Sequence, residues 1–221
     1  MFTIQNTLQS FFNAVHEGRY SAAVKAKTKG LSFLTTYITP EPRTDLPILD
    51  EIPGMLENST VPHLEPLAAD LEEVVPLLKW STFYERNNLT QGFIGQFAVA
   101  ELAGPNGPVI AKKATIGLFV MGANTYYPLH WHDASEVYFV LCGHPWFMVG
   151  DNMWKQKQAG DAVRVPGNVP HAISNENEPM LVMYIWRGKV RKKPIFPVDS
   201  GNHPAHLVNA EMTAEFDDTR S

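Results

Sequence analysis

The sequence predicts a mainly β fold, an antiparallel jelly-roll barrel preceded by an α-helical N-terminal region. Up to about residue 79, apolar residues recur at helical spacing. From Trp80 onwards the chain changes to short runs rich in β-branched and aromatic residues, separated by Gly, Pro and Asn turns. Short strands at this spacing are typical of jelly-roll barrels. We therefore expect a helical region at 1–79 that packs on the barrel, a barrel domain at 80–190 and a C-terminal tail at 191–221.

The helical region is expected in several pieces. Gly18 interrupts the first apolar stripe, and Ser21 can cap a second short helix. A further helix is expected at 30–37, followed by a proline-rich loop at 39–62 and a helix at 64–79. With 221 residues and 44% hydrophobic composition, the chain can bury one good-sized core. The apolar stripes of the helices either cover the barrel or form the contact of a homodimer.

The β half divides into strand candidates bounded by turn residues. Runs rich in Val, Ile and aromatic residues between Gly, Pro and Asn favour strands over helices. We expect strands at 93–101, 109–120, 130–143, 146–149, 153–157, 161–165, 171–174 and 180–186.

Composition and charge exclude several classes of protein. The net charge of −5 and the pI near 5.9 give no sign of a nucleic-acid-binding surface. The single cysteine, Cys142, excludes an internal disulfide. No segment is apolar enough to span a bilayer, and the N-terminus lacks a basic stretch followed by an apolar run. We expect a soluble cytoplasmic protein with no membrane partner.

Two histidines, a carboxylate and a phenol occupy even-numbered positions between 130 and 138. In an extended run, side chains two apart share a face, so these four point to the same side: His130, His132, Glu136 and Tyr138. By the same parity, Cys142 lies on this face as a small buried thiol. Imidazole and carboxylate ligands suit a divalent first-row metal ion. The run therefore predicts a metal site.

A fourth ligand candidate, His171, follows the turn at Pro166 and Gly167. Three ligands on one face together with a fourth favour metal binding over ordinary surface or core histidines. The remaining histidines, His144 among them, have no paired ligand pattern, and we expect them to be solvated.

The two segments together resemble the paired motifs of the cupin superfamily. The first cupin motif is matched by His130, His132, Glu136 and Gly143, and the second by Gly160, Pro166, His171 and Asn175. One position departs from the pattern, because Asn168 stands where the second motif has glycine. Asparagine tolerates a left-handed turn conformation, so the turn can still form. The resemblance implies a cupin barrel, a fold that hosts many different reactions.

A narrower resemblance covers about residues 127–188. The combination H-x-H-x-x-x-E-x-Y, then V-P-H, then Y-x-W-R-G is similar to the bacterial cupin-type dimethylsulfoniopropionate (DMSP) lyases. This resemblance implies a small-molecule substrate, DMSP, which β-elimination converts to dimethyl sulfide, acrylate and a proton. Metal coordination of the substrate carboxylate would stabilise the enolate-like transition state of that reaction.

The resemblance and the residue chemistry together suggest roles for four aromatic side chains. Tyr138 is the expected base, provided that a nearby cation lowers the pKa of a phenol that ordinarily titrates near pH ~10. Tyr127 is the second candidate, as base, proton relay or substrate clamp. Tyr184 and Trp186 could place aromatic faces against the sulfonium. For each of the four, a purely structural role in the barrel wall is the competing interpretation.

Two other functions remain open at the level of the sequence. The same ligands could serve an iron-dependent dioxygenase acting on a small carboxylate, or the chain could be a non-catalytic small-molecule-binding cupin. The native metal is also open, because a site of three imidazoles and one carboxylate accepts iron, manganese, zinc, nickel or cobalt.

Overall fold

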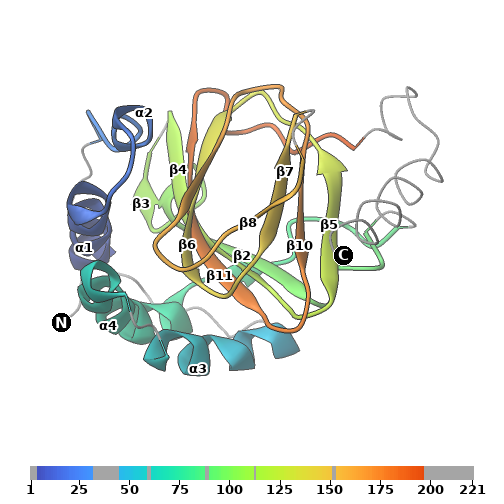
Figure 1. Cartoon of the computed structure of the whole chain (residues 1–221), viewed down its shortest axis with the longest axis horizontal. Coiled ribbons are helices and arrows are strands. Elements are labelled where there is room, and N and C mark those ends of the chain that lie inside the picture. The colour runs from blue at the N-terminus through green and yellow to red at the C-terminus, as the bar shows by residue number, and fades with distance from the viewer. Residues whose placement is uncertain are drawn as a thin grey trace.

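Two largely antiparallel sheets close into a barrel, and helices from the N-terminal part lie along one outer side of it (Figure 1). The computed structural model describes residues 4–31, 45–58, 61–87, 90–111, 113–150 and 153–196. Over this part of the chain, the mainly β, cupin-type jelly-roll barrel with a helical N-terminal region is confirmed. None of the described helices is both long and apolar enough to cross a membrane.

The larger sheet has the strand order β1-β2-β4-β11-β6-β9, with β3 attached to β2. Its strands are β1 (Trp80–Ser81), β2 (Phe97–Gly104), β3 (Val109–Ile110), β4 (Ala114–Met121), β6 (Ser135–Cys142), β9 (Ala162–Val165) and β11 (Met180–Arg187). The smaller sheet has the order β5-β10-β7-β8. Its strands are β5 (Thr125–His130), β7 (Trp146–Val149), β8 (Lys155–Gln156) and β10 (His171–Asn175).

The described helices are short. They are α1 (Ile4–Glu17), α2 (Ala22–Lys25), α3 (Ile52–Glu57) and α4 (Glu65–Val74), with 3-10 turns at Pro47–Glu51, Pro62–Leu64 and Val75–Leu77. The predicted cap of α2 is confirmed, because the Ser21 hydroxyl accepts a hydrogen bond from the Val24 amide at 3.3 Å. The predicted helix at 64–79 changes to a 3-10 turn at Val75, next to Pro76.

The prediction of a loop at 39–62 is wrong for its described part. A 3-10 turn begins at Pro47 and α3 follows it, with Pro53 in the first turn of α3. Proline is tolerated in the first turn of a helix, where its missing amide has no intrahelical partner, so these prolines begin helical turns instead of ending them. Residues 32–37 of the helix predicted at 30–37 lie outside the described residues.

The single strand predicted at 130–143 is also wrong. Strand β5 ends at His130, and β6 begins at Ser135 in the other sheet. Between them Trp131 forms a two-way backbone pair with Ile195, at 3.0 and 2.8 Å. The alternation of side chains therefore does not continue from 130 to 138, and the site residues converge from two sheets. The strands predicted at 93–101 and 109–120 are likewise shifted or split, as the bounds of β2, β3 and β4 show.

The helices share a core with the outer face of the larger sheet. The Phe11 ring of α1 meets the edge of Phe139 of β6 at a centroid distance of 5.1 Å and an interplanar angle of 85°. Tyr20 contacts the same ring at 5.4 Å. This outer core also contains the buried side chains of α3 and α4, so the helical region and the barrel exclude water from one another.

Cys142 belongs to this outer core, which corrects its predicted place on the ligand face. The register of β6 against β11 shifts between Leu181 and Val182, and this irregularity breaks the alternation before Cys142. The thiol donates to the Met55 carbonyl at 3.0 Å. Burial raises the pKa of Cys142 to about 12, so the thiol is inert near neutral pH.

A second core lies inside the barrel and is rich in aromatic residues. Phe97, Phe119 and Tyr127 lie within 4.8–5.8 Å of one another, measured between ring centroids. Tyr138 and Tyr184 belong to the same cluster. The interior of the barrel is thus filled by rings that hold the side chains described below.

Phe11→Ala tests the shared outer core. We expect this variant to lower the free energy of unfolding by about 3–5 kcal/mol, because it leaves a cavity against Phe139. Chemical denaturation followed by tryptophan fluorescence and far-UV circular dichroism measures the change. Glu17→Ala, an exposed change at the end of the same helix, is the control and should alter stability by less than about 0.5 kcal/mol. Separate transitions for the two probes would contradict a common core.

Candidate active site

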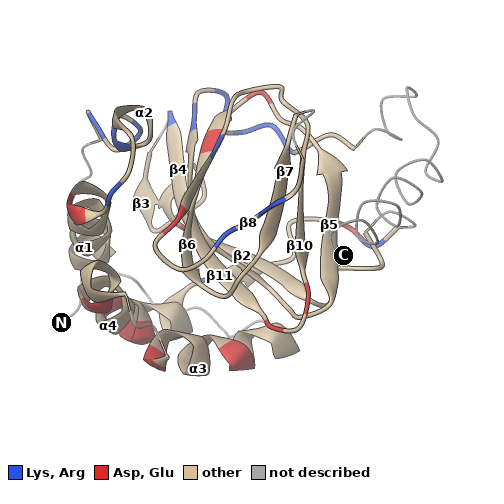
Figure 2. Cartoon of the chain, viewed as in Figure 1, with Lys and Arg blue, Asp and Glu red and all other residues tan. Residues whose placement is uncertain are grey.

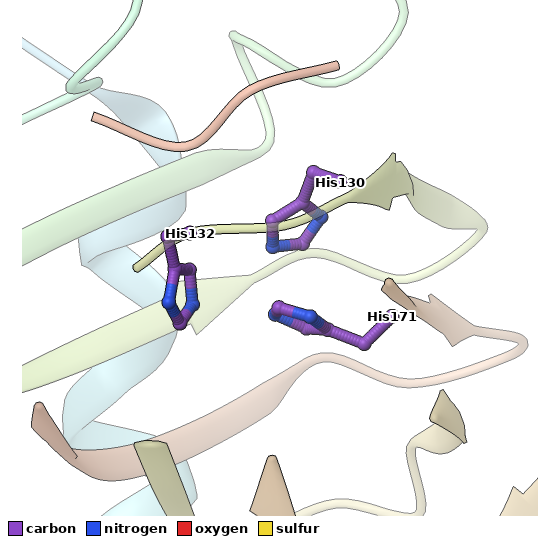
Figure 3. A group of neighbouring side chains, drawn as sticks. All are labelled: His130, His132 and His171. Atoms are coloured by element: carbon purple, nitrogen blue, oxygen red, sulfur yellow. The ribbon is translucent and has the colours of Figure 1, made fainter. Parts of the chain in front are cut away.

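Three buried imidazoles converge at one end of the smaller sheet (Figure 3). His130 is the last residue of β5, His132 follows two residues later, and His171 is the first residue of β10. His171 pairs with His130 across the two strands. One nitrogen from each ring lies within 4.8 Å of the other two. This spacing fits three ligands around one metal ion.

Backbone carbonyls fix the orientation of all three rings. His130 Nδ1 lies 2.7 Å from the Pro128 carbonyl oxygen, His132 Nδ1 2.8 Å from that of Ala134, and His171 Nδ1 3.0 Å from that of Val169. A carbonyl can only accept, so each Nδ1 carries the proton and donates. Each Nε2 is therefore the nitrogen left for a ligand bond, an arrangement typical of metal-binding histidines.

Glu136 lies beside the three imidazoles, on β6 of the other sheet. Its Oε2 is 2.9 Å from His132 Nε2 and 3.8 Å from His171 Nε2. The carboxylate and these two rings are almost completely buried. All four predicted ligands thus lie together, with the carboxylate next to a group of three histidines.

A divalent cation fits this donor set. His171 Nε2 is buried and has no hydrogen-bond partner within the described part of the chain, which is costly unless another group occupies that position. Burial lowers the pKa of His171 to about 4 and that of His130 well below its usual range. Both rings are therefore neutral near pH 7, the state in which imidazole binds a metal.

His132 responds differently to its surroundings. Burial alone lowers its pKa, but the hydrogen bond and charge of Glu136 more than offset burial and raise the pKa above the usual value. A proton therefore lies between His132 Nε2 and the carboxylate of Glu136. A metal ion between the two side chains would take the place of that proton.

The turn of the second motif packs against the backbone of the first motif, next to the candidate ligands. Asn168 adopts the left-handed conformation predicted for it, with φ of 61°. Its amide donates to the His132 carbonyl at 2.8 Å. At Gly167 a Cβ would lie 2.5 Å from the Asp133 carbonyl oxygen, so only glycine fits. The departure from the glycine pattern therefore leaves the turn packed against the first motif.

A pocket with a cavity volume of about 50 Å³ lies inside the barrel. Four predicted site residues line it, namely Tyr127, Tyr138, Tyr184 and Trp186, together with Glu136. The imidazoles lie next to these lining residues: the Tyr127 and His130 ring centroids are 4.0 Å apart, and those of Trp186 and His132 are 4.4 Å apart. The other lining residues are Phe83, Phe97, Val99, Glu101, Thr115, Phe119, Val190 and Pro194.

Burial raises the pKa values of the tyrosines of the pocket. Burial, followed by the charge and hydrogen bond of Glu136, raises the pKa of Tyr138 well above its usual range. For Tyr127 burial is again the main cause, followed by Tyr84. The hydroxyl groups of Tyr127 and Tyr84 form a short hydrogen bond. Any role for either phenol as a base requires a positive charge close by to lower its pKa.

Sequence reasoning missed several residues that line this pocket or contact its lining. Tyr84 and Phe83 lie outside any motif, and no periodic pattern marks them. Val190 is the last residue of the predicted barrel domain, and Pro194 and Phe196 lie in the predicted C-terminal tail; the Phe196 ring centroid is 6.0 Å from that of His130. Glu101 ends a predicted strand with the same parity as Phe97 and Val99. This parity is the one signal that could have placed an acid inside the barrel.

Comparison with known proteins agrees with the motifs. A family model for dimethylsulfoniopropionate lyase matches residues 34–182. The DMSP lyase DddQ of Ruegeria pomeroyi is 26% identical over 195 residues, which cover 87% of this chain and 96% of that relative. The crystal structure of DddQ from the same organism superposes with a TM-score of 0.68 at 27% identity, covering 87% of this chain and 95% of that one.

A second solved chain, from crystal structures of the DMSP lyases RdDddP and RnDddQII, superposes with a TM-score of 0.72. It is 20% identical and covers 87% of this chain and 96% of that chain, which shows the common fold. The family model spans more than half of the 221 residues and includes the four predicted metal ligands. This chain therefore belongs to the dimethylsulfoniopropionate lyase family of carbon–sulfur lyases.

Proposed function

We propose that this protein cleaves DMSP by metal-dependent β-elimination to dimethyl sulfide, acrylate and a proton. The observation that supports this most is the placement of three converging imidazoles directly beside a pocket lined by phenols and indole. Similarity to DddQ, a DMSP lyase, supports the choice of substrate. A cation held by His130, His132, His171 and Glu136 would act as a Lewis acid on the substrate carboxylate.

Proton removal is the task of the chain's own side chains. We assign it to the phenolate oxygen of Tyr138, which lies on the same strand face as Glu136. The electron pair of the Cα–H bond forms the new C=C bond, and the pair of the Cβ–S bond leaves with sulfur as neutral dimethyl sulfide. Tyr127 is the second candidate for the base, and Tyr84 holds its hydroxyl in place.

The remaining lining residues position the substrate and exclude water. Trp186 lies against His132, and its Nε1 has no hydrogen-bond partner among the described residues. The faces of Trp186 and Tyr184 can contact the sulfonium, an interaction of about 1 kcal/mol or more when desolvated. Val190 and Pro194, which follow β11, also line the pocket.

Purified protein incubated with DMSP under strict anaerobiosis tests the reaction class. We expect dimethyl sulfide and acrylate in equal amounts, at the same rate as in air, because elimination consumes no oxygen. Treatment with a chelator should stop the release, and added divalent metal should restore it. Headspace gas chromatography and acrylate quantification measure the two products.

Two results would contradict the proposal. Turnover that requires oxygen would favour an iron-dependent dioxygenase that uses the same four ligands. Tight binding of DMSP without any product, in protein with full metal content, would favour a non-catalytic binding protein.

A further inference from the structure

The pocket contains a second carboxylate that the proposed reaction does not use, that of Glu101. It lies near the end of β2 and lines the pocket with Phe97 and Val99, which alternate with it along the strand. Glu136 lines the same pocket from β6. The pocket therefore has one carboxylate beside the imidazoles and another on a different strand of the same sheet.

Strand register shows how Glu101 relates to the proposed base. Glu101 pairs with Gly117 of β4, and Gly117 pairs with Tyr184 of β11. Tyr184 in turn pairs with Tyr138 of β6. These four residues form one row across adjacent strands of the larger sheet. Within this row, Tyr184 and Gly117 lie between the proposed base, Tyr138, and Glu101.

Gly117 leaves the space through which Tyr184 approaches Glu101. A Cβ at Gly117 would lie 2.6 Å from the Tyr184 hydroxyl oxygen and 2.4 Å from the Ala100 carbonyl oxygen. The Tyr184 hydroxyl therefore lies over the glycine, towards the strand of Glu101. In agreement, after burial the largest effect raising the pKa of Tyr184 is the charge of Glu101, ahead of that of Glu136.

The Glu101 carboxylate is held in a fixed position. Its Oε2 accepts a hydrogen bond from the Asn106 amide at 2.9 Å, and its Oε1 accepts one from Asn106 Nδ2 at 3.3 Å. At Gly104 a Cβ would come within 2.5 Å of Oε2. The turn after β2 thus closes around the carboxylate and orients it.

No positive side chain balances the two carboxylates within the pocket lining. Lysines do lie close in sequence to the lining residues Val190 and Pro194, at an end of the barrel where Lys and Arg gather (Figure 2). Lys189 and Lys192 pair with Asp133 at 3.6 and 2.8 Å, and Lys193 lies 5.8 Å from the centre of the ring of Phe83, a lining residue, but none of the three lysines is itself part of the lining. The lining itself is apolar, aromatic and acidic, which suits a cation with apolar substituents.

We propose that Glu101 is the counter-charge for the sulfonium of the substrate and selects a positively charged leaving group. This inference rests on the proposed function, because it takes the substrate carboxylate to bind at the imidazoles. The sulfur of DMSP lies three bonds from the carboxylate carbon, so it extends from the metal centre into the pocket. Glu101 attracts it there by charge, while Tyr184 and Trp186 contact its methyl groups.

The chemistry of elimination determines which kinetic constant Glu101 controls. As the Cβ–S bond breaks, its electron pair goes to sulfur and the positive charge disappears. Glu101 therefore stabilises bound DMSP more than it stabilises the transition state, and it does not retain the neutral sulfide product. A group of this kind lowers KM without raising kcat.

Glu101→Gln removes the charge and keeps an acceptor for the Asn106 amide. We expect KM for DMSP to rise about ten-fold, with kcat unchanged or slightly higher, as for loss of one charge pair in a partly buried site. Inhibition by 3-(methylthio)propionate, which has the same carboxylate but a neutral sulfur, should be equal in the variant and the parent protein. Asn106→Ala is the matched control: it removes only the Nδ2 contact to Oε1, keeps the backbone amide bond to Oε2 and the charge, and should leave KM within about two-fold.

Calorimetric titration of both proteins with DMSP and with the neutral thioether completes the test. An unchanged KM and unchanged DMSP affinity in Glu101→Gln, or an equal loss for both ligands, would overturn the inference. These results differ from failure of the proposed function, in which the parent protein itself releases no dimethyl sulfide.

Discussion

We expect His171→Ala to lose its bound metal and to release no measurable dimethyl sulfide, while the barrel remains folded. His171 Nε2 is buried, has no hydrogen-bond partner in the described part of the structure and lies 3.8 Å from Glu136. Side chains that merely orient a metal ligand contribute about 10–100-fold to affinity or activity, so removal of a ligand should cost more than about 100-fold. The strand persists because its ladder bonds to β5 and β7 come from the backbone.

Elemental analysis of the purified variant measures metal content, and circular dichroism checks the fold. His144→Ala is the matched control, because His144 is about half exposed and interacts with Glu178, away from the site. We expect the control to keep full metal content and activity. Undiminished metal in His171→Ala would remove this residue from the ligand set.

The candidate metal ligands could be grouped from the sequence, although one step of the reasoning was wrong. Local spacing marks His130, His132 and Glu136 as a set, and the distant His171 is identified by the turn motif before it. The structure brings these four together. It does so by crossing from one sheet to the other between His130 and Ser135, where parity along a single strand does not apply. Spacing identified the group, whereas tertiary structure determined how it converges.

The residues that reach the site from outside the motifs could not be predicted in the same way. Tyr84 reaches the site only because its ring packs on Phe93 and Phe97 inside the barrel. Phe196 reaches it because Ile195 pairs with Trp131. Both placements depend on contacts between segments far apart in the chain, and no local pattern encodes such contacts. Parity within one strand could have indicated Glu101, but only once the inner face of β2 was known.

The choice between two tyrosines as the base is decided by a pair of conservative changes. Tyr138→Phe keeps the ring contact with Phe147, at 5.3 Å between centroids, and removes the oxygen beside Glu136. We expect kcat to fall by about 10²–10⁴-fold, with metal content and fold unchanged, because loss of a general base acts on the chemical step. KM should change little, since the substrate carboxylate still has its binding site.

Tyr127→Phe and Tyr84→Phe are the matched controls, since the two phenols share one hydrogen bond. If Tyr127 only supports the site, each change removes the same bond, and the double variant should be little worse than either single one. If Tyr127 is the base, Tyr127→Phe eliminates turnover, Tyr138→Phe retains most of it, and Tyr84→Phe causes a smaller loss through the position of the Tyr127 hydroxyl. The assignment to Tyr138 therefore requires a specific order of kcat values, in which the Tyr138 variant is slowest and the Tyr127 and Tyr84 variants are similar. A steady-state comparison at saturating DMSP measures that order directly, because at saturation differences in KM no longer affect the rate.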